Sequence, residues 1–383
     1  MVEFMTQISI IIPIYNAEDY LNECLDSVVN QTLSDIEIIC INDGSSDNSL
    51  SIVEEFATKD SRIKIISQKN NGQGSARNKG LNIANGKYIY FMDADDKIEL
   101  NTLNDCYEIM EKDNLDFVMF QLINYDDEND VFYQENDYDM PKINKLVENN
   151  IFSYNDLNHL IFQVAVSPVN KLYNKKFLEN INVKFPEDVI FEDNIFFWNV
   201  FLNAEKIKFI PQHYYIRRRH SLSTTGNAGI RFVDTLEVHN RIFEIFKKFN
   251  LFEEFKRNLF NKKISLANIR FNQVHEEFKS DFFKEMKKDF ENMINQYGKN
   301  IVLNNLNSEN KLIFETVIVS RGFEEFVLLL ENSFLKSEVK FNKSKNKELK
   351  NEINNIKKEN ELILSSNSWK ITKPLRIIKN SFK

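Results

Sequence analysis

The chain has 383 residues, 42% of them apolar and 33 of them Phe, which is enough for a large domain with a Phe-rich core and a smaller companion. The net charge is −8, yet residues 336–383 carry 13 Lys and Arg against five Asp and Glu. The acidic remainder of the chain excludes nucleic acid as the main partner.

Three further patterns bound the class of protein. The three cysteines have neither metal-ligand spacing nor the number of a disulfide framework, which indicates a reducing compartment. No apolar run is long enough to span a membrane as a helix, and the N-terminus shows no signal-peptide pattern. We therefore expect a cytoplasmic protein.

Apolar runs and helical spacing alternate over the first 92 residues. Strands are predicted at 8–14, 35–42, 63–66 and 88–92, and helices at 16–29, 49–57 and 74–84. This alternation predicts an α/β fold with a parallel sheet, helices on both faces and ligands at the carboxyl ends of the strands. Pro13, Asp43, Gly72 and Asp93 all fall at such ends.

The later segments differ in pattern. Residues 126–140 hold seven acids and no base, which predicts a solvated excursion, such as a hairpin, and residues 232–335 have helical spacing. A 4–3 spacing then continues in Leu349, Ile353, Ile356, Asn360 and Ile363. This spacing fits a short coiled coil with Asn in its seam, and a single surface helix fits equally well. We predict three regions: a catalytic domain at 1–230, a helical domain at 231–340, and a basic helical tail at 341–383.

The apolar run that ends at Met92 is followed by Asp93, Asp95 and Asp96. Three crowded carboxylates repel one another, and a divalent cation relieves that repulsion. Mg²⁺ and Mn²⁺ prefer oxygen ligands, often one or two carboxylates together with substrate phosphates. This motif therefore favours a metal-assisted site for a phosphorylated substrate, although a turn or a helix cap is the plainer interpretation of the motif alone.

Two other strand ends favour a nucleotide. Asp43 could accept a hydrogen bond from a base, while Pro13 and Tyr15 could form an apolar wall against it. Gly72 permits close backbone approach, and Arg77 offers a planar donor fork to a phosphate or a base. Ordinary capped turns and a surface arginine are the structural alternatives. A dinucleotide fingerprint is rejected, because Arg77 stands where its third glycine is required.

Charged side chains also flank two later segments. Glu192 and Asp193 precede an apolar helical run. There they either stabilise the positive N-terminal end of the helix dipole or provide a general base. Arg219 is the last of three consecutive arginines, and His220 follows it. This basic segment is either a solvated loop or a phosphate site. His220 would then ligate the metal or contact a diphosphate.

In this order the motifs resemble those of the family 2 glycosyltransferases, which are inverting enzymes with the GT-A fold. The resemblance implies an α/β fold whose sheet is mixed but mainly parallel and flanked by helices, followed by a helical C-terminal region. The resemblance covers about residues 6–225 and rests on Ile11-Ile12-Pro13-Ile14-Tyr15-Asn16, Asp43-Gly44-Ser45-Ser46-Asp47, Asn71-Gly72, Ala76-Arg77-Asn78, Asp93-Ala94-Asp95-Asp96, Asn170-Lys171-Leu172-Tyr173 and Glu192-Asp193. It implies that the nucleobase, most often uracil, is held by Pro13, Tyr15 and Asp43, with Asn16 in the same donor motif.

The resemblance also implies roles for the acids. Asp93 would lie near the ribose and the sugar, and Asp95 or Asp96 would ligate Mn²⁺ or Mg²⁺. Asp193 would be the catalytic base, with Glu192 nearby. The implied reaction moves a sugar from a nucleoside-diphosphate sugar to a glycan or lipid-linked glycan acceptor in bacterial surface polysaccharide synthesis.

The remaining expectations concern partners and alternatives. The basic segment 369–383 has Trp at one end and helical apolar spacing, which suits the anionic inner face of the cell membrane, while docking on another subunit is the alternative. The helical region or the tail would support a homo-oligomer. A sugar nucleotidyltransferase is less favoured, because the loop after the first strand is acidic and lacks glycine. A non-catalytic nucleotide-sugar-binding or scaffold subunit is the other alternative.

Overall fold

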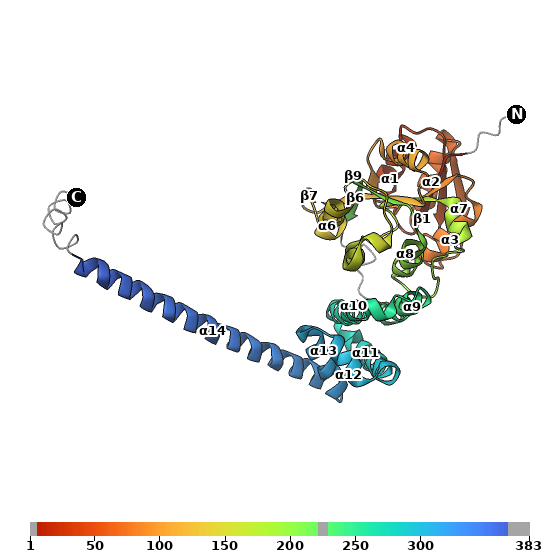
Figure 1. Cartoon of the computed structure of the whole chain (residues 1–383). Coiled ribbons are helices and arrows are strands. Elements are labelled where there is room, and N and C mark those ends of the chain that lie inside the picture. The colour runs from red at the N-terminus through yellow and green to blue at the C-terminus, as the bar shows by residue number, and fades with distance from the viewer. Residues whose placement is uncertain (1–5, 221–228, 367–383) are drawn as a thin grey trace. The chain divides into compact units, whose positions relative to one another are not determined.

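The computed structural model describes residues 6–220 and 229–366 (Figure 1). Internal contacts divide the chain into two compact units, residues 1–311 and 312–383, and each is described by itself. The boundaries predicted near residues 230 and 340 follow changes in sequence pattern, which is a different criterion, and they stay a prediction.

The first unit is built on a sheet of nine strands in the described part of the chain. The strands are β1 (Ile8–Ile14), β2 (Ile36–Asn42), β3 (Ile63–Ser67), β4 (Tyr88–Phe91), β5 (Lys97–Ile98), β6 (Phe117–Asp126), β7 (Val131–Tyr133), β8 (Lys171–Asn174) and β9 (Ile207–Arg219). They lie in the order β3-β2-β1-β4-β8-β6-β9-β5, with β7 paired to β6.

The two halves of this sheet pair differently. β3, β2, β1 and β4 are parallel neighbours, as predicted. β8 runs antiparallel to both β4 and β6, and β9 is parallel to β6. The chain therefore enters β8 at Lys171, beside the edge where β4 ends, and β9 ends at Arg219 on that same edge. The predicted mixed α/β class is confirmed.

Helices cover both faces of the sheet. They include α1 (Leu21–Val29), α2 (Ser49–Lys59), α3 (Gln73–Ile83), α4 (Thr102–Asp113), α7 (Lys175–Asn180) and α8 (Glu192–Asn203). Residues of α1 and α4 share one buried core with alternate β1 residues such as Ile10 and Ile12. On the opposite face, Gly80 of α3 lies so close to Ile11 that a Cβ would meet its Cγ2 at 2.4 Å, and Phe196 of α8 packs against Phe91.

The acidic excursion at residues 126–140 contains the expected hairpin. β6 and β7 pair antiparallel, with Asp126 opposite Val131, and they are followed by α5 (Asn136–Asp139) and α6 (Pro141–Val147). The excursion is less solvated than predicted, because Asp127 pairs with Arg218 and Asp139 lies 2.7 Å from a ring nitrogen of His213. Short 3₁₀ helices follow at Tyr154–Asp156, Asn158–Gln163 and Ile230–Val233.

The rest of the first unit is helical, as the spacing predicts. Its helices are α9 (Asp234–Lys248), α10 (Phe252–Gln273), α11 (Glu276–Tyr297) and α12 (Lys299–Asn305). The expected Phe-rich core is confirmed, since side chains such as Phe243, Phe246 and Phe260 are buried and pack edge to face or tilted against other aromatic rings. These interlocking rings leave the helices little freedom to shift against one another.

α13 (Ser308–Val319) crosses the division between the units, and α14 (Phe323–Ser365) lies in the second unit. Figure 1 shows α14 as one unbroken helix. The residues of the predicted membrane-surface segment, 369–383, lie outside the described residues, so that prediction stays a prediction. Within the described ranges, no helix is long and apolar enough to cross a membrane.

Candidate active site

The loops after β1 and β2 are joined at the carboxyl edge of the sheet. Pro13 is buried at the end of β1, and Tyr15 beyond it is 54% exposed, so its ring is free to form the predicted apolar wall. Asn16, with a positive φ of 47°, donates its backbone N–H to Ser45 and accepts from the backbone N–H of Ser46 at 2.8 Å. Asn16 therefore fixes the two loops to each other.

Asp43, directly after β2, organises the loop after β3. Its buried carboxylate accepts hydrogen bonds from the Gln68 amide at 2.8 Å and from the backbone N–H groups of Asn71 and Gly72 at 2.9 Å each. Gly72 has a φ of +89° and open space where a Cβ would stand. A left-handed glycine facing open space can lie close to a ligand. The carboxylate expected to hold a base thus also shapes the backbone beside it.

The three acids after β4 lie in different environments. Asp96 is buried, and its carboxylate accepts from the Tyr215 hydroxyl at 2.6 Å and the Arg218 backbone N–H at 2.7 Å. Burial, with the nearby charges of Asp95 and Asp93, raises the pKa of Asp96 well above its usual range. Both oxygens of Asp96 are thus engaged in holding β9 in place, which leaves Asp95 as the better-placed metal ligand of the two predicted.

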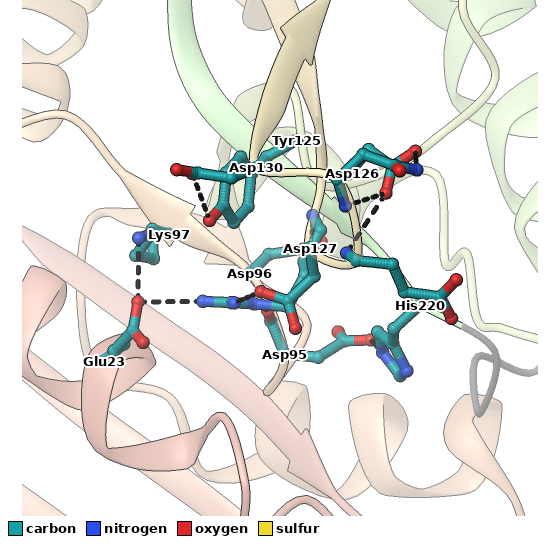
Figure 2. Close-up of polar contacts among 12 residues, drawn as sticks. Glu23, Asp95, Asp96, Lys97, Tyr125, Asp126, Asp127, Asp130 and His220 are labelled. Carbon is teal, nitrogen blue, oxygen red and sulfur yellow. Dashed lines mark hydrogen bonds and ion pairs between the residues drawn. The ribbon is translucent and has the colours of Figure 1, made fainter.

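Asp95 meets His220 across the sheet edge, as Figure 2 shows. The His220 Nε2 lies 3.0 Å from an Asp95 carboxylate oxygen, and its ring packs 4.4 Å from that of Tyr20. The backbone carbonyl of Asp95 accepts from Nε of Arg218, whose two terminal nitrogens reach Glu23 and an acid of the excursion, Asp127. Asp95 and His220, two of the three residues predicted as metal ligands, are therefore neighbours although they lie 125 positions apart in the sequence.

Asp95 and His220 can be compared with the ligands that Mg²⁺ and Mn²⁺ usually have in proteins. In the described residues no group of three or more His, Cys, Asp and Glu converges as a complete metal cage. The buried Nδ1 of His220 finds no hydrogen-bond partner there either. Mg²⁺ and Mn²⁺ are commonly held by one or two protein ligands, with water and substrate phosphates supplying the others. Asp95 and His220 fit that pattern.

Arg77 joins the acids after β4 to the start of α8. Its guanidinium, 3% exposed, donates to Asp93 at 2.8 Å and to Glu192 at 2.9 Å, and it lies over the ring of Phe185. Gln73 donates to the same Asp93 oxygen at 2.8 Å. In this structure the terminal nitrogens that were expected to face a phosphate are occupied by carboxylates. Arg77 is a positioning residue here.

These neighbours set the protonation of the two acids. Burial raises the pKa of Asp93 above its ordinary value, although the charge of Arg77 opposes the shift. Burial likewise raises the pKa of Glu192 to about 7, again against the effect of Arg77. A buried carboxyl near neutrality is typical of functional sites.

Two small contacts bring the distant segments together. A Cβ on Gly74 would lie 2.5 Å from the Pro186 carbonyl, so only glycine lets α3 approach this segment so closely. The Asn78 amide accepts from the backbone N–H of Phe185 at 2.9 Å and donates to its carbonyl at 2.8 Å. This role of Asn78 was not predicted, because its partner lies 107 positions away in the sequence.

Asp193 is the second residue of α8, which begins after Phe191 in a left-handed conformation with φ 64°. Its side chain is half-buried, and one carboxylate oxygen accepts from the backbone and side-chain N–H groups of Asn194 at 2.8 Å. The second oxygen accepts no hydrogen bond from the described residues. Asp193 is therefore more accessible to an acceptor hydroxyl than the buried Glu192.

Lys171, at the start of β8, is fully buried. Its ammonium donates to the carbonyls of Ala165 and Ser167 and to Asn170, at 2.6–2.8 Å. Burial lowers the pKa of Lys171 to about 7. The resemblance included Lys171, but its use as an anchor for the preceding loop was not predicted.

The three arginines at the end of β9 have different hydrogen-bond and ion-pair partners. Arg217 donates to the Tyr138 hydroxyl at 2.6 Å. Arg218 is engaged with acids on two sides. Arg219 is half-buried, and the described residues form no ion pair with it, so it is the arginine of the three best able to meet a phosphate.

The chain is similar in sequence to known glycosyltransferases. The family model described as "Glycosyl transferase family 2" matches residues 9–181. The chain is 35% identical to the uncharacterized glycosyltransferase EpsJ of Bacillus subtilis, over 57% of this chain and 62% of that protein, which is less than two thirds of its length. It is 31% identical to the cholesterol galactosyltransferase of Borreliella burgdorferi, over 67% of this chain and 72% of the relative.

The fold also has a solved counterpart. Residues 1–349 of Staphylococcus aureus TarS, in complex with UDP-GlcNAc, match with a TM-score of 0.67 and 21% identity, over 86% of this chain and 92% of that chain. At this identity the likeness shows the fold alone. The predicted mixed sheet with flanking helices and a helical C-terminal region is confirmed by this match.

Proposed function

The chain belongs to the family 2 glycosyltransferases, and we propose that it is an inverting enzyme that moves a sugar from a UDP-sugar to a hydroxyl group of a bacterial surface glycan or glycolipid, with Mn²⁺ or Mg²⁺ as cofactor. The observation that carries the proposal is the contact of one guanidinium with both Asp93 and Glu192. It joins Asp93, after β4, to the start of α8, where the proposed base Asp193 follows Glu192.

On the donor side, the loops after β1, β2 and β3 would bind the nucleotide. The exposed ring of Tyr15 would stack on the base, and Asp43 would orient it while holding the loop that contains Gly72. Asp95 and His220 would hold the cation, which stabilises charge on the departing diphosphate when it is bound. Arg219 would contact the same phosphates.

On the acceptor side, Asp193 would remove the proton from the attacking hydroxyl. The acceptor oxygen forms a bond to the anomeric carbon, and the bond from that carbon to the diphosphate oxygen breaks with inversion. The proton goes to Asp193, and the electron pair leaves with the nucleoside diphosphate. Glu192 and Arg77 would hold the start of α8 in place for this step.

The choice of a UDP-sugar is supported by the TarS structure with UDP-GlcNAc, whose fold this chain shares. A further relative, the poly(ribitol-phosphate) beta-glucosyltransferase of Bacillus spizizenii, is 33% identical over 56% of this chain and 32% of that protein, and it supports a surface-polymer acceptor. The UDP-sugar is a ligand of TarS and the surface polymer is named for the glucosyltransferase. For this chain, the donor and the acceptor are therefore part of the proposal.

A panel of UDP-, GDP-, CDP- and dTDP-sugars, each with Mn²⁺ and with EDTA, tests the proposal by nucleotide release. We expect release from a UDP-sugar in the presence of Mn²⁺ and its loss in EDTA. Calorimetric binding of UDP with no release from any donor, even with cell-wall glycan added as acceptor, would instead favour a binding or scaffold subunit. Pyrophosphate-dependent formation of UTP would favour a nucleotidyltransferase.

A further inference from the structure

The second half of α14 is covered by no other part of the described chain. Every residue from 342 to 365 is exposed. Helices in water gain most of their stability from packing an apolar face, yet several apolar side chains of this helix are 45% exposed or more. Those at 45–59% exposure on one stripe are Leu328, Leu335, Leu349, Ile353, Ile356 and Ile363.

These six residues share one heptad register. With Ile353 at position a, all the others fall at position d, at 328, 335, 349, 356 and 363. The sequence spacing alone covered about two heptads, and the exposure of Leu328 and Leu335 in the same register extends the seam over five. Two exposed leucines, Leu362 and Leu364, lie off the seam and offer internal controls.

The seam also contains polar residues. Asn332, Asn346 and Asn360 occupy position a at intervals of two heptads, with Ile353 between the last two, and Asn342 occupies one d position. A buried Asn at position a pairs with the same residue of a neighbouring helix, which fixes the register and favours two parallel strands at some cost in stability. Asn332, Asn346 and Asn360 would each meet their own equivalent only in a parallel, in-register pair.

The flanking charges select the same orientation. Lys343, Lys350 and Lys357 all lie at position e, so an antiparallel pair would set lysines of one helix against lysines of the other. In a parallel pair, position g meets position e of the following heptad in the second helix. Glu352 then meets Lys357, an attractive pair, while Lys345 meets Lys350, one like-charge pair.

We propose that α14 forms a parallel, in-register, two-stranded coiled coil with α14 of a second copy of this chain, from Leu328 to Ile363. This interface is separate from the active site and does not depend on the proposed function. Because the strands are parallel, both catalytic units would be joined to the same end of the coil. Two active sites on one dimer could then bind the same repeating polymer together.

The mass of the full chain in solution, measured by light scattering, tests the interface. We expect a dimer for the wild type, a monomer for Ile356→Lys and a dimer for Leu362→Lys, which places the same charge on the same helix outside the seam. Donor hydrolysis should be equal in all three, because the active site is untouched. A monomeric wild type at tens of micromolar, or a dimer that survives Ile356→Lys, would overturn the proposal, and a trimer would overturn the two-strand assignment.

Asn360→Cys tests the orientation. Mild oxidation should link two copies through position a in a parallel pair, whereas an antiparallel pair sets residue 360 opposite residues near 331. Leu362→Cys is the control, and the native cysteines are buried. A dimer that does not cross-link at 360 would overturn the parallel arrangement. Vesicles with anionic lipid that pellet a monomeric wild type and Leu362→Lys, but not Ile356→Lys, would assign the seam to a membrane and contradict the proposal.

Discussion

The two units of this chain use charged residues in opposite ways. At the sheet edge of the first unit, Arg77, Glu192 and Lys171 are buried. Arg77 and Glu192 pair across 115 positions of sequence, and Lys171 is held by acceptors in the six residues before it. Along α14 of the second unit, the charged residues beyond Asn342 are all exposed. Burial shifts the pKa and fixes the geometry in the first case, whereas in the second the charges act only on a partner.

The largest effect is expected where the first unit does chemistry. Asp193→Asn should lower the turnover number by about 10²–10⁴-fold, because the amide cannot take the proton of the acceptor hydroxyl. The measurement is nucleotide release with the donor found in the panel. Glu187→Gln, an exposed acid of the preceding segment, is the control. Turnover above a tenth of the wild-type value would remove Asp193 from the role of base.

A second large effect is expected at the metal. Asp95→Asn should abolish the stimulation of nucleotide release by Mn²⁺, while His220→Ala should raise the Mn²⁺ concentration needed for half of the full rate. Asp96→Asn should instead mainly lower the unfolding temperature, since its carboxylate holds Tyr215 and the backbone of Arg218. The opposite result, with Asp96→Asn losing the metal response and Asp95→Asn keeping it, would exchange the two assignments.

Removing the central guanidinium should cost stability. Arg77→Ala leaves Asp93 and Glu192 without their buried counter-charge, and breaking a buried pair in this way costs about 3–5 kcal/mol. The free energy of unfolding in urea measures it. Lys358→Ala, on the exposed part of α14, should cause no measurable change. Equal stabilities for the two variants would contradict the contrast between the units.

The smallest effect is expected in the pH dependence of stability. The pKa of Glu192 is raised from 4.5 to about 7. Its contribution to stability is therefore complete below about pH 4.5 and is lost as the pH rises through 7. Glu192→Gln should remove this loss, which unfolding in urea at pH 5, 6, 7 and 8 would measure.

Other buried groups change the free energy of unfolding with pH in the opposite direction. Only the difference in this free energy between the variant and the wild type is therefore informative. Burial lowers the pKa of His239 to about 4 and that of Lys171 to about 7, and both make the protein more stable as the pH rises. A Glu192→Gln curve parallel to that of the wild type between pH 5 and 8 would show that Glu192 does not titrate there.

Much of the fold follows from local patterns. Apolar runs predicted both ends of each strand from β1 to β4 to within one residue, because a buried strand needs a continuous apolar sequence. The antiparallel β8 and the irregular pairing of β6 with β9, which shifts register at Gln121, were not predictable. Those pairings depend on contacts between segments about 50 to 90 residues apart.

The site was predictable in outline only. Strand ends identified Asp43 and Asp93, since parallel strands deliver their carboxyl ends to one edge. The sequence could not tell Asp95 from Asp96, because the difference is set by Tyr215, 119 positions away from Asp96. Nor could it predict that Arg77 pairs with Glu192, because these residues lie 115 positions apart. The 4–3 spacing from Leu349 to Ile363, by contrast, is a local repeat that the sequence shows, whereas its extension to Leu328 and Leu335 rests on their exposure in the structure.

The most direct test of these site assignments is a calorimetric titration of UDP into the wild type, Asp193→Asn and Asp95→Asn, each with Mn²⁺ and with EDTA. We expect wild-type affinity and Mn²⁺ dependence for Asp193→Asn, and loss of the Mn²⁺ dependence for Asp95→Asn. Loss of UDP binding in Asp193→Asn, or unchanged Mn²⁺-dependent binding in Asp95→Asn, would contradict the division of the site into a donor side and a base.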